Sequence, residues 1–360
     1  MPMDESYDII IVGAGPAGSS AALAAAQRGA KVLLLDQRQR IGVPVQCAEF
    51  VPRAISRAVP FSSTSVVQTI ETMTTHLPDQ STYEMKSPGY MLDRSIFDKE
   101  LAASAVQQGA HLSVQTRVTG LTPDGVVVQQ GEGKRFIRSK VVIGADGVRS
   151  SVAQWVGGRR RKEIVALQYE VVIPRPLDTV EVFFSREVEG GYAWFFPKGK
   201  TANVGIGIVP QKASLLTTLL AGFLDGLVAA KDFSGIHIVG KTGGAIPCDE
   251  AGQTVYGNVL LAGDAAGHAH PITGAGILTA VTGGEMAGRI SAEAVLNGNL
   301  THLHHYEAEW LETFGKSLSY GASKRRFMED NWNNNGINFN ELIHQTWIGF
   351  KEYYKDRRKQ

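Results

Sequence analysis

A cysteine close to a glutamate is the first feature that could do chemistry. The segment GVPVQCAEF (42–50) places Cys47 two residues before Glu49, and its proline disfavours both helix and strand. A thiol there could be a small buried hydrophobe, a nucleophile, half of a disulfide, or a group that contacts a redox-active ring. The other cysteine, Cys248, lies far away in the sequence, and no Cys-x-x-Cys pair exists. This cysteine usage indicates a reducing compartment, so we expect a cytoplasmic location.

Histidines form the second candidate group. His268 and His270 lie two residues apart in GDAAGHAHP (263–271), and HLHH follows at 302–305. A closed metal site needs three or four converging ligands, and no carboxylate or thiol spacing supports one here, so we predict no metal. A histidine beside a redox cofactor is more simply interpreted as a proton donor or charge partner near neutral pH. His270 is therefore a candidate catalytic residue.

The first forty residues have the order of a dinucleotide-binding unit. A β-branched strand pattern (7–12) runs into GAGPAG, an alanine-rich helical stretch follows, and a second apolar strand pattern ends at Asp36. Gly13 permits a tight turn, Gly15 lets the backbone approach a pyrophosphate, and Gly18 lets the helix pack closely on the strand. The helix N-terminus offers N–H groups to the phosphates, while Asp36 can hydrogen-bond a ribose hydroxyl. An acid at this point favours NAD or FAD over NADP.

Two later segments decide between NAD and FAD. VVIGADGVRSSVA (141–153) contains a strand followed by an Asp-Gly pair at Asp146, and NVLLAGDAAGHAHPITGAGI (258–277) contains a strand that ends at Asp264. The sequence resembles the flavoproteins of the para-hydroxybenzoate hydroxylase superfamily, whose three FAD signatures are G-x-G-x-x-G, a central D-G and a late G-D. The resemblance implies that Asp264 holds the ribityl or ribose part of FAD. It also implies that the helix after Asp264 points its N-terminus at the flavin, where it would stabilise the negative charge of the reduced ring.

Within that superfamily the chain resembles the geranylgeranyl reductase family. The resemblance extends along the chain as far as the helix after the late G-D. The matching stretches include IGVPVQCAEF, GYAWFFPKGKTANVGIGI and GDAAGHAHPITGAGI, of which the last two are the most specific. The resemblance places Cys47 and Ala48 beside the isoalloxazine, Arg94 toward the FAD phosphates, Val118 by the adenine, and the backbone of Gly276 and Ile277 against the flavin. The predicted FAD-binding residues are therefore Gly13, Gly15, Gly18, Asp36, Cys47, Ala48, Arg94, Val118, Asp146, Asp264, Gly276 and Ile277.

The resemblance suggests what the thiol does. At the flavin face, the Cys47 thiol can pack on the ring or donate a weak hydrogen bond, and it is a candidate catalytic residue in that sense. It is not expected to be a covalent nucleophile, because flavin chemistry needs no protein adduct. A structural buried cysteine is the alternative.

Aromatic side chains alternate along GYAWFFPKG. Tyr192, Trp194 and Phe196 share one face of this predicted strand, where they would line a cavity for an apolar or aromatic substrate. Core packing is the alternative for each ring. The family usually has Asp at the position of His270 and Gly at that of Phe50, so this chain departs from the family pattern on the substrate side.

The elements that must position these residues define the expected fold. We predict an α/β chain, α+β overall, with a Rossmann-like FAD-binding domain threaded through 1–60, 90–155 and 245–300. An inserted antiparallel β-sheet substrate domain takes 61–89 and 156–244, and a helical C-terminal region takes 301–360.

Two reactions fit this architecture, and fold alone does not choose between them. In the first, NADH, NADPH or another reductant reduces FAD, and the flavin then delivers a hydride to a C=C bond of an isoprenoid, as in geranylgeranyl reductases. In the second, the reduced flavin activates O2 and a monooxygenase hydroxylates an aromatic ring. That ring could be a tryptophan side chain of a partner protein during maturation of a quinone cofactor. A flavin-binding protein without enzymatic activity is a third class. We take the first reaction as the leading expectation.

Composition limits the partners. The formal net charge of +1 gives no reason to expect nucleic-acid binding. The basic segments GGRRRKE (157–163) and FKEYYKDRRKQ (350–360) leave a peripheral membrane surface open as a partner, beside an apolar small molecule or a partner protein. No uninterrupted apolar run reaches the roughly 18 residues of a membrane span, and the acidic start of the chain predicts no signal peptide.

Overall fold

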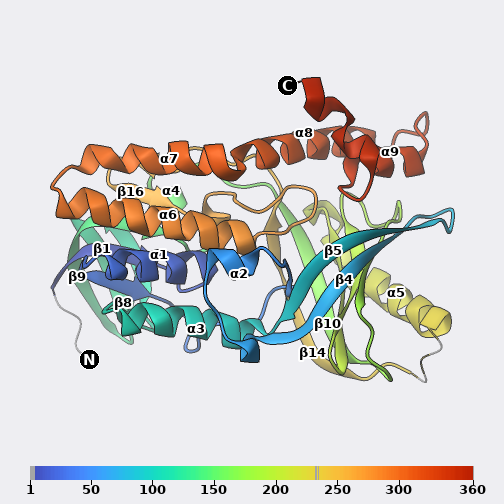
Figure 1. Ribbon diagram of the computed structural model, residues 1–360, viewed down its shortest axis with the longest axis horizontal. Coiled ribbons are helices and arrows are strands. Elements are labelled where there is room, and N and C mark those ends of the chain that lie inside the picture. Colours follow the sequence, from blue (N-terminus) through green and yellow to red (C-terminus); the bar gives the residue numbers. More distant parts are fainter. Residues whose placement is uncertain (1–4, 232, 234, 360) are drawn as a thin grey trace.

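Two sheets of eight strands each organise the chain, and they lie side by side along its longest axis (Figure 1). The computed structural model describes residues 5–231, 233 and 235–359. Helices pack on both sheets, and the C-terminal helices α7 and α8 run along one side of the molecule across both halves (Figure 1). The mixed α/β architecture with a Rossmann-like first half confirms the predicted fold class.

Each of the three predicted FAD signatures comes directly after a strand of the first sheet. Strand β1 pairs in parallel with β2 on one side and β9 on the other, and Ile9, Ile10 and Ile11 are completely buried between them. A strand covered on both faces reads as a continuous apolar run, which is why it was visible in the sequence. The strands of this sheet are β1 (Ser6–Val12), β2 (Val32–Leu35), β6 (His111–Ser113), β7 (Arg117–Thr122), β8 (Gly125–Gln130), β9 (Gly133–Gly144), β15 (Val255–Tyr256) and β16 (Val259–Leu261).

Small residues let two helices of the first half touch backbone to backbone. A Cβ atom on Gly284 or Gly288 of α6 would come within 2.1 and 2.0 Å of the carbonyl oxygens of Ala17 and Ala21 in α1. Only glycine permits so close an approach. The helices of this half are α1 (Pro16–Gln27), α2 (Ile55–Ala58), α3 (Arg94–Gln107), α4 (Ser151–Trp155) and α6 (Ile277–Leu296).

The second sheet is mixed rather than purely antiparallel, which corrects the prediction. Its order is β14-β10-β13-β12-β11-β4-β5-β3, and β11 pairs with β4 in parallel. These two strands come from segments separated by a long part of the first half, so no tight turn forces them to run in opposite directions. The strands are β3 (Phe50–Pro52), β4 (Val66–His76), β5 (Thr82–Leu92), β10 (Glu163–Val172), β11 (Thr179–Phe183), β12 (Tyr192–Lys198), β13 (Thr201–Ile208) and β14 (Ile238–Pro247).

The second sheet extends beyond the boundaries expected from the sequence. β3, the end of β5 and the end of β14 all pair in it, although they fall within 1–60, 90–155 and 245–300. The junctions at 89/90 and 244/245 therefore lie inside strands β5 and β14.

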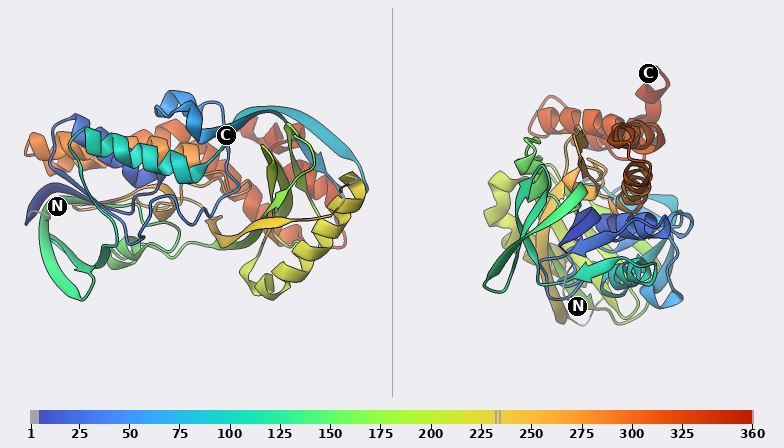
Figure 2. Two further views of the ribbon diagram at one scale, coloured as in Figure 1. Left: turned by 90° about the horizontal axis from the view of Figure 1, so that it is seen from below. Right: turned by 90° about the vertical axis from the view of Figure 1, so that its left-hand side faces the viewer.

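The two faces of β12 belong to different cores. Ala193 and Phe195 pack on the side of helix α5 (Leu216–Lys231), while Tyr192, Trp194 and Phe196 face the C-terminal helices. α5 lies at the outer end of the second sheet, away from the first half (Figure 2). The C-terminal helices are α7 (His304–Trp310), α8 (Lys316–Asn331) and α9 (Phe339–Thr346), with a π-helical turn at Leu311–Gly315.

One stretch among the described residues, Pro210–Lys231, is long and apolar enough by composition to cross a membrane. Its mean hydropathy is 1.7, and 17% of the window is buried. Leu220, Leu224 and Leu227 of α5 form its buried side and pack on the second sheet, as an amphipathic helix of a globular core does.

Candidate active site

The glycine loop after β1 has the shape of a phosphate cradle. Gly13 has a φ of +101°, and a Cβ atom there would lie 2.4 Å from the carbonyl oxygen of Ala145. A Cβ atom on Gly18 would lie 1.8 Å from the carbonyl oxygen of Gly13. A Cβ atom on Gly15 would meet nothing within 4 Å, and no side chain caps α1 at this point. The loop thus leaves open space directly in front of free helix N–H groups, where an anionic phosphate fits.

Asp36 lies where β2 ends, beside this loop. One carboxylate oxygen accepts a hydrogen bond from the N–H of Ala14 at 2.9 Å, and the other accepts one from the N–H of Arg38 at 2.7 Å. Its carboxylate holds the loop, and each oxygen has a further lone pair for a ribose hydroxyl.

The central D-G signature acts differently from the prediction. The carboxylate of Asp146 accepts hydrogen bonds from the N–H groups of Ser151 and Val152, at 2.7 and 3.2 Å, and so caps α4. The backbone of Ala145 and Asp146, rather than the Asp146 carboxylate, lies against Gly13 of the cradle. The structure therefore assigns Asp146 to positioning the turn.

The late G-D segment brings Asp264 to the start of α6. Asp264 lies in a 3-10 turn (Gly263–Ala265), and a Cβ atom on Gly276, the residue before α6, would lie 3.4 Å from its Oδ1 atom. No side chain caps α6, so its first N–H groups are free for a ligand. Burial raises the pKa of Asp264, and the nearby Arg94 guanidinium opposes that shift.

Cys47, Arg94 and Asp264 converge from three distant segments. Arg94 forms two hydrogen bonds with Asp98, at 2.8 and 2.7 Å, which fix its guanidinium group. Burial raises the pKa of the Cys47 thiol, and the neighbouring Arg94 only partly offsets this. The thiol is therefore protonated at neutral pH. A protonated thiol is a weak hydrogen-bond donor, whereas a nucleophilic cysteine is a thiolate.

Glu49 anchors the loop that carries Cys47. It has a φ of +69° and is 2% exposed. Its Oε1 atom accepts the N–H of Arg94 at 2.9 Å, while Oε2 accepts Lys198 Nζ at 2.5 Å and Asn203 Nδ2 at 2.9 Å. One carboxylate thus connects the cysteine loop, α3 and two strands of the second sheet.

The second sheet also holds the cysteine loop through its backbone. Gln168 donates to the carbonyl oxygen of Cys47 at 3.0 Å, and Asn203 donates to that of Ala48 at 3.2 Å. Sequence reasoning missed Gln168, Lys198 and Asn203 as site residues. The signal was present, because polar residues inside otherwise apolar strands of the family motif need buried partners.

The three predicted substrate-binding rings divide between cavity and core. Tyr192 lines an apolar cavity, whereas Trp194 and Phe196 are absent from its lining. Trp194 donates from Nε1 to Gln168 at 3.0 Å, and Phe196 packs edge-on against Phe50. For Trp194 and Phe196 the structure favours the core alternative.

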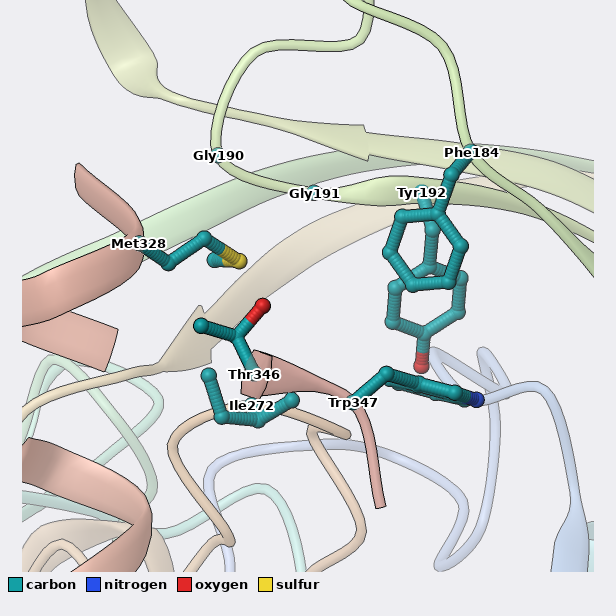
Figure 3. A pocket seen from close by; sticks show the side chains of 8 residues that line it. All are labelled: Phe184, Gly190, Gly191, Tyr192, Ile272, Met328, Thr346 and Trp347. Atoms are coloured by element: carbon teal, nitrogen blue, oxygen red, sulfur yellow. The ribbon is translucent and has the colours of Figure 1, made fainter. Parts of the chain in front are cut away.

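The cavity lies between the second sheet and the C-terminal helices (Figure 3). Its empty space is about 200 Å³ including open solvent, of which a water-sized molecule can reach only about 10 Å³. The Tyr192 hydroxyl donates to the carbonyl oxygen of Thr273 at 2.6 Å, and its pKa is raised by burial and by the nearby Cys47. The lining residues are Phe184, Gly190, Gly191, Tyr192, Ile272, Met328, Thr346 and Trp347. Most of these could not be identified from sequence, because they come from four separate segments.

His270 does not have the environment of a proton donor. Burial lowers its pKa to about 4, and its Nδ1 atom accepts from the N–H groups of Ile272 and Thr273, both at 3.4 Å. Its Nε2 atom therefore carries the proton and lies 3.3 Å from the Tyr353 hydroxyl. His270 thus ties the loop after Asp264 to the C-terminal segment, and its catalytic role stays a prediction.

His268 is fully buried, and burial lowers its pKa to about 3. Among the described residues neither of its ring nitrogens has a hydrogen-bond partner. Its ring packs against Trp310 and Phe314. Within the described part of the chain, no group of three or more His, Cys, Asp and Glu side chains converges as a metal site would.

The remaining predicted positions surround the same region. Val118 is buried on β7 beside the core of the first sheet, Ala48 packs against the core of the second half, and Ile277 begins α6. Two uncapped helix N-termini, the space before Gly15, Asp36 beside that loop and the convergence of Cys47, Arg94 and Asp264 all fit an FAD molecule. FAD bound there would supply hydride transfer, and the chain's residues would bind and orient it.

Comparison with known proteins agrees with this geometry. The family of FAD dependent oxidoreductases matches residues 8–148, and the geranylgeranyl reductase catalytic domain matches residues 164–246. A digeranylgeranylglycerophospholipid reductase of Methanococcus aeolicus is 34% identical over 350 residues, covering 92% of this chain and 90% of the relative. The same enzyme of Methanocaldococcus jannaschii is 35% identical over 343 residues, covering 91% and 88%.

Solved structures show the same fold. A geranylgeranyl bacteriochlorophyll reductase-like protein from Thermoplasma acidophilum superposes with a TM-score of 0.86 at 25% identity, covering 98% of this chain and 99% of that one. A flavin-dependent brominase shares the fold, with a TM-score of 0.75 at 18% identity over 98% of each chain.

The fold and the site define an FAD-dependent oxidoreductase. Its relatives are reductases; the first matched family region covers most strands of the first sheet and three of the second, and the other lies in the second half. The chain belongs to the geranylgeranyl reductase family, which confirms the resemblance seen in its motifs.

Proposed function

We propose that this protein reduces C=C bonds in the isoprenoid chains of a glycerophospholipid. The observation that carries the proposal is the apolar cavity bounded by Tyr192, Trp347 and Met328, beside the loop of Cys47. Such a lining selects an apolar chain and excludes water from a reacting double bond. Relatives that share about a third of their residues with this chain carry the name of that activity.

The electron donor is part of the proposal. NADH or NADPH, or another reductant, would reduce the bound FAD before the isoprenoid reacts. A cavity group must then protonate the carbon next to the one that receives the hydride. The Tyr192 hydroxyl lies on the cavity wall and donates to the carbonyl oxygen of Thr273, so it orients the cavity rather than supplying this proton.

The proposed place of action is the cytoplasmic surface of a membrane, where a lipid substrate resides. Two features support contact with lipid. The first is the basic segment 157–163. The second is the exposed side of α5, which consists of small residues and has Asp225 as its one charged residue.

The reaction is tested with purified holoenzyme and a geranylgeranylated phospholipid under anaerobic conditions. Dithionite, NADH and NADPH are compared as reductants, and product mass is followed. The expected product gains two hydrogens per reduced double bond. Oxygen is then admitted in a parallel sample, and a hydroxylated product that forms only with oxygen would reassign the protein to monooxygenase chemistry.

The cavity is tested by a pair of variants. Met328→Phe should fill the cavity and raise KM for the isoprenoid roughly fivefold or more, with FAD content unchanged. Trp194→Phe serves as the core comparison, because Trp194 lies outside the cavity lining; it loses its hydrogen bond to Gln168 and part of its buried ring. Equal KM values in the two variants would show that the cavity does not receive substrate.

A further inference from the structure

A second, larger cleft lies on the other side of the turn that walls the apolar cavity. It offers about 1170 Å³ of space open to solvent. Its lining contains five basic side chains, which come from the 160–162 segment, the 3-10 turn after β13 (Pro210–Leu215) and α8: Arg160, Arg161, Lys162, Lys212 and Arg325. A space of this size and composition differs sharply from the apolar cavity beside it.

The acidic side chains of the cleft do not neutralise this charge. Three acids line it, and two of them pair with its bases: Glu189 with Lys212 at 2.5 Å, and Glu329 with both Arg325 at 2.6 Å and Lys162 at 3.7 Å. The third acid, Glu163, forms its ion pair with Arg149, which is not part of the lining. The cleft therefore carries an excess of positive charge, and Arg160 adds to it as an exposed side chain.

Two of the arginines are buried with unused donors. Arg325 is 4% exposed and Arg161 is 9% exposed. Within the described part of the chain, the Nη2 atom of Arg325 and the Nε atom of Arg161 have no hydrogen-bond partner. A buried donor without a partner is costly, and arginine donors are matched best by carboxylate or phosphate oxygens. Both side chains line the cleft, although these two donor atoms themselves are buried.

The cleft and the apolar cavity share a wall. Gly190 lines both spaces, and α8 directs Met328 to the cavity while Arg325 and Glu329 line the cleft. Figure 3 shows Gly190 and Met328 on the same side of the cavity. Any molecule that fills both spaces must have an anionic end and an apolar end.

We propose that the cleft binds the phosphate headgroup of the lipid whose isoprenoid chain enters the apolar cavity. This inference rests on the proposed function and adds to it a headgroup site. The headgroup would hold the lipid at one end and determine which double bonds reach the flavin. A nicotinamide dinucleotide also carries phosphates that this cleft would recognise, so the test separates the lipid headgroup from the dinucleotide.

The test compares two charge-matched double variants of the holoenzyme. Arg160→Gln/Lys162→Gln removes two exposed charges from the cleft, while Arg175→Gln/Lys200→Gln removes two exposed charges elsewhere. Substrates are geranylgeranyl phosphate and geranylgeraniol, with dithionite as reductant. The cleft variant should raise KM for the phosphate roughly tenfold and leave KM for the alcohol unchanged, because charge-assisted hydrogen bonds to phosphate are lost. The control variant should change neither.

Each other outcome has a distinct meaning. An equal KM change for phosphate and alcohol would overturn the headgroup site while leaving the reductase activity standing. Slower flavin reduction by NADPH in the cleft variant, with an unchanged KM for the phosphate, would overturn it in favour of the dinucleotide. If wild-type protein reduces neither these substrates nor the geranylgeranylated phospholipid, the proposed function itself fails.

Discussion

The two halves of this protein build their sites by different means. The first half uses backbone: the glycines of the cradle, the free N–H groups of α1 and α6, and a carboxylate at the end of β2. The second half uses side chains that meet across segments, as Glu49 does with Lys198 and Asn203. Backbone sites need particular residues at fixed local spacing, whereas side-chain sites need only the final arrangement in space. This difference decides how each half should respond to mutation.

The largest contrast should come from two glycines of the cradle. Gly15→Val should reduce FAD content to below about a tenth of wild type, because its side chain enters the open space where a pyrophosphate would lie. The apoprotein should melt at nearly the wild-type temperature, because a Cβ atom there meets nothing within 4 Å. Absorbance of the purified protein and thermal melting of the apoprotein measure the two effects.

Gly18→Val is the matched control. A Cβ atom there would lie 1.8 Å from the carbonyl oxygen of Gly13, so this variant should lose stability as well as FAD. If Gly15→Val purifies with full flavin, the backbone account of the first half is wrong.

The next largest effect should follow from removing the anchor of the cysteine loop. Glu49→Gln leaves the largely buried Lys198 without its charge partner, which should lower the free energy of unfolding by about 3–5 kcal/mol. FAD affinity should fall too, because the loop of Cys47 loses its hold on the second sheet. Urea unfolding and FAD titration give the two measurements.

Asn203→Ala is the milder comparison, because it removes one neutral donor from Glu49 and costs about 1–3 kcal/mol. Equal losses for both variants would mean that the buried charge pair contributes no more to the free energy of unfolding than a neutral hydrogen bond does.

An effect of intermediate size on stability should appear at low pH, and it should come from two histidines in the loop that joins the two halves. Burial holds His268 and His270 neutral, with pKa values lowered from 6.5 to about 3 and about 4. The unfolded chain therefore binds more protons as the pH falls below 6.5, and stability is lost between that pH and about 4. Both histidines contribute to the slope of stability against pH in this window. Urea unfolding at a series of pH values measures this slope.

His268→Leu should remove one of the two contributions and flatten the dependence in this window. A slope identical to that of wild type would place the acid sensitivity elsewhere, in carboxylates that are paired in the folded state.

The smallest effect should come from Cys47. Cys47→Ser should shift the flavin absorbance or potential slightly while the fold survives, since a hydroxyl is less polarizable than a thiol. Because burial raises the thiol pKa above its usual 9.0, alkylation at pH 8 should be slow in the folded protein and fast after unfolding. Rapid alkylation of the folded protein would instead indicate an activated thiolate.

The cofactor half was largely predictable because its rules are local. The buried run of β1, the glycines at 13, 15 and 18, and the acid that ends β2 follow one another within about thirty residues, as a βαβ unit requires. Asp146 shows the limit even here. Its sequence position in the D-G signature was correct, but three-dimensional contacts show its carboxylate capping α4 instead of facing a ligand.

The sequence by itself determined the cofactor class, the family and the alternation of β12, because glycine spacing and a period of two are properties of the local chain. Only the tertiary structure decided which aromatic rings line the cavity and that His270 is held neutral. It also revealed that Glu49 is an anchor and that a basic cleft adjoins an apolar cavity. The physical reason is that burial and pairing arise between residues far apart in sequence. Lys198 and Arg94 reach the same carboxylate only after the two sheets have packed together.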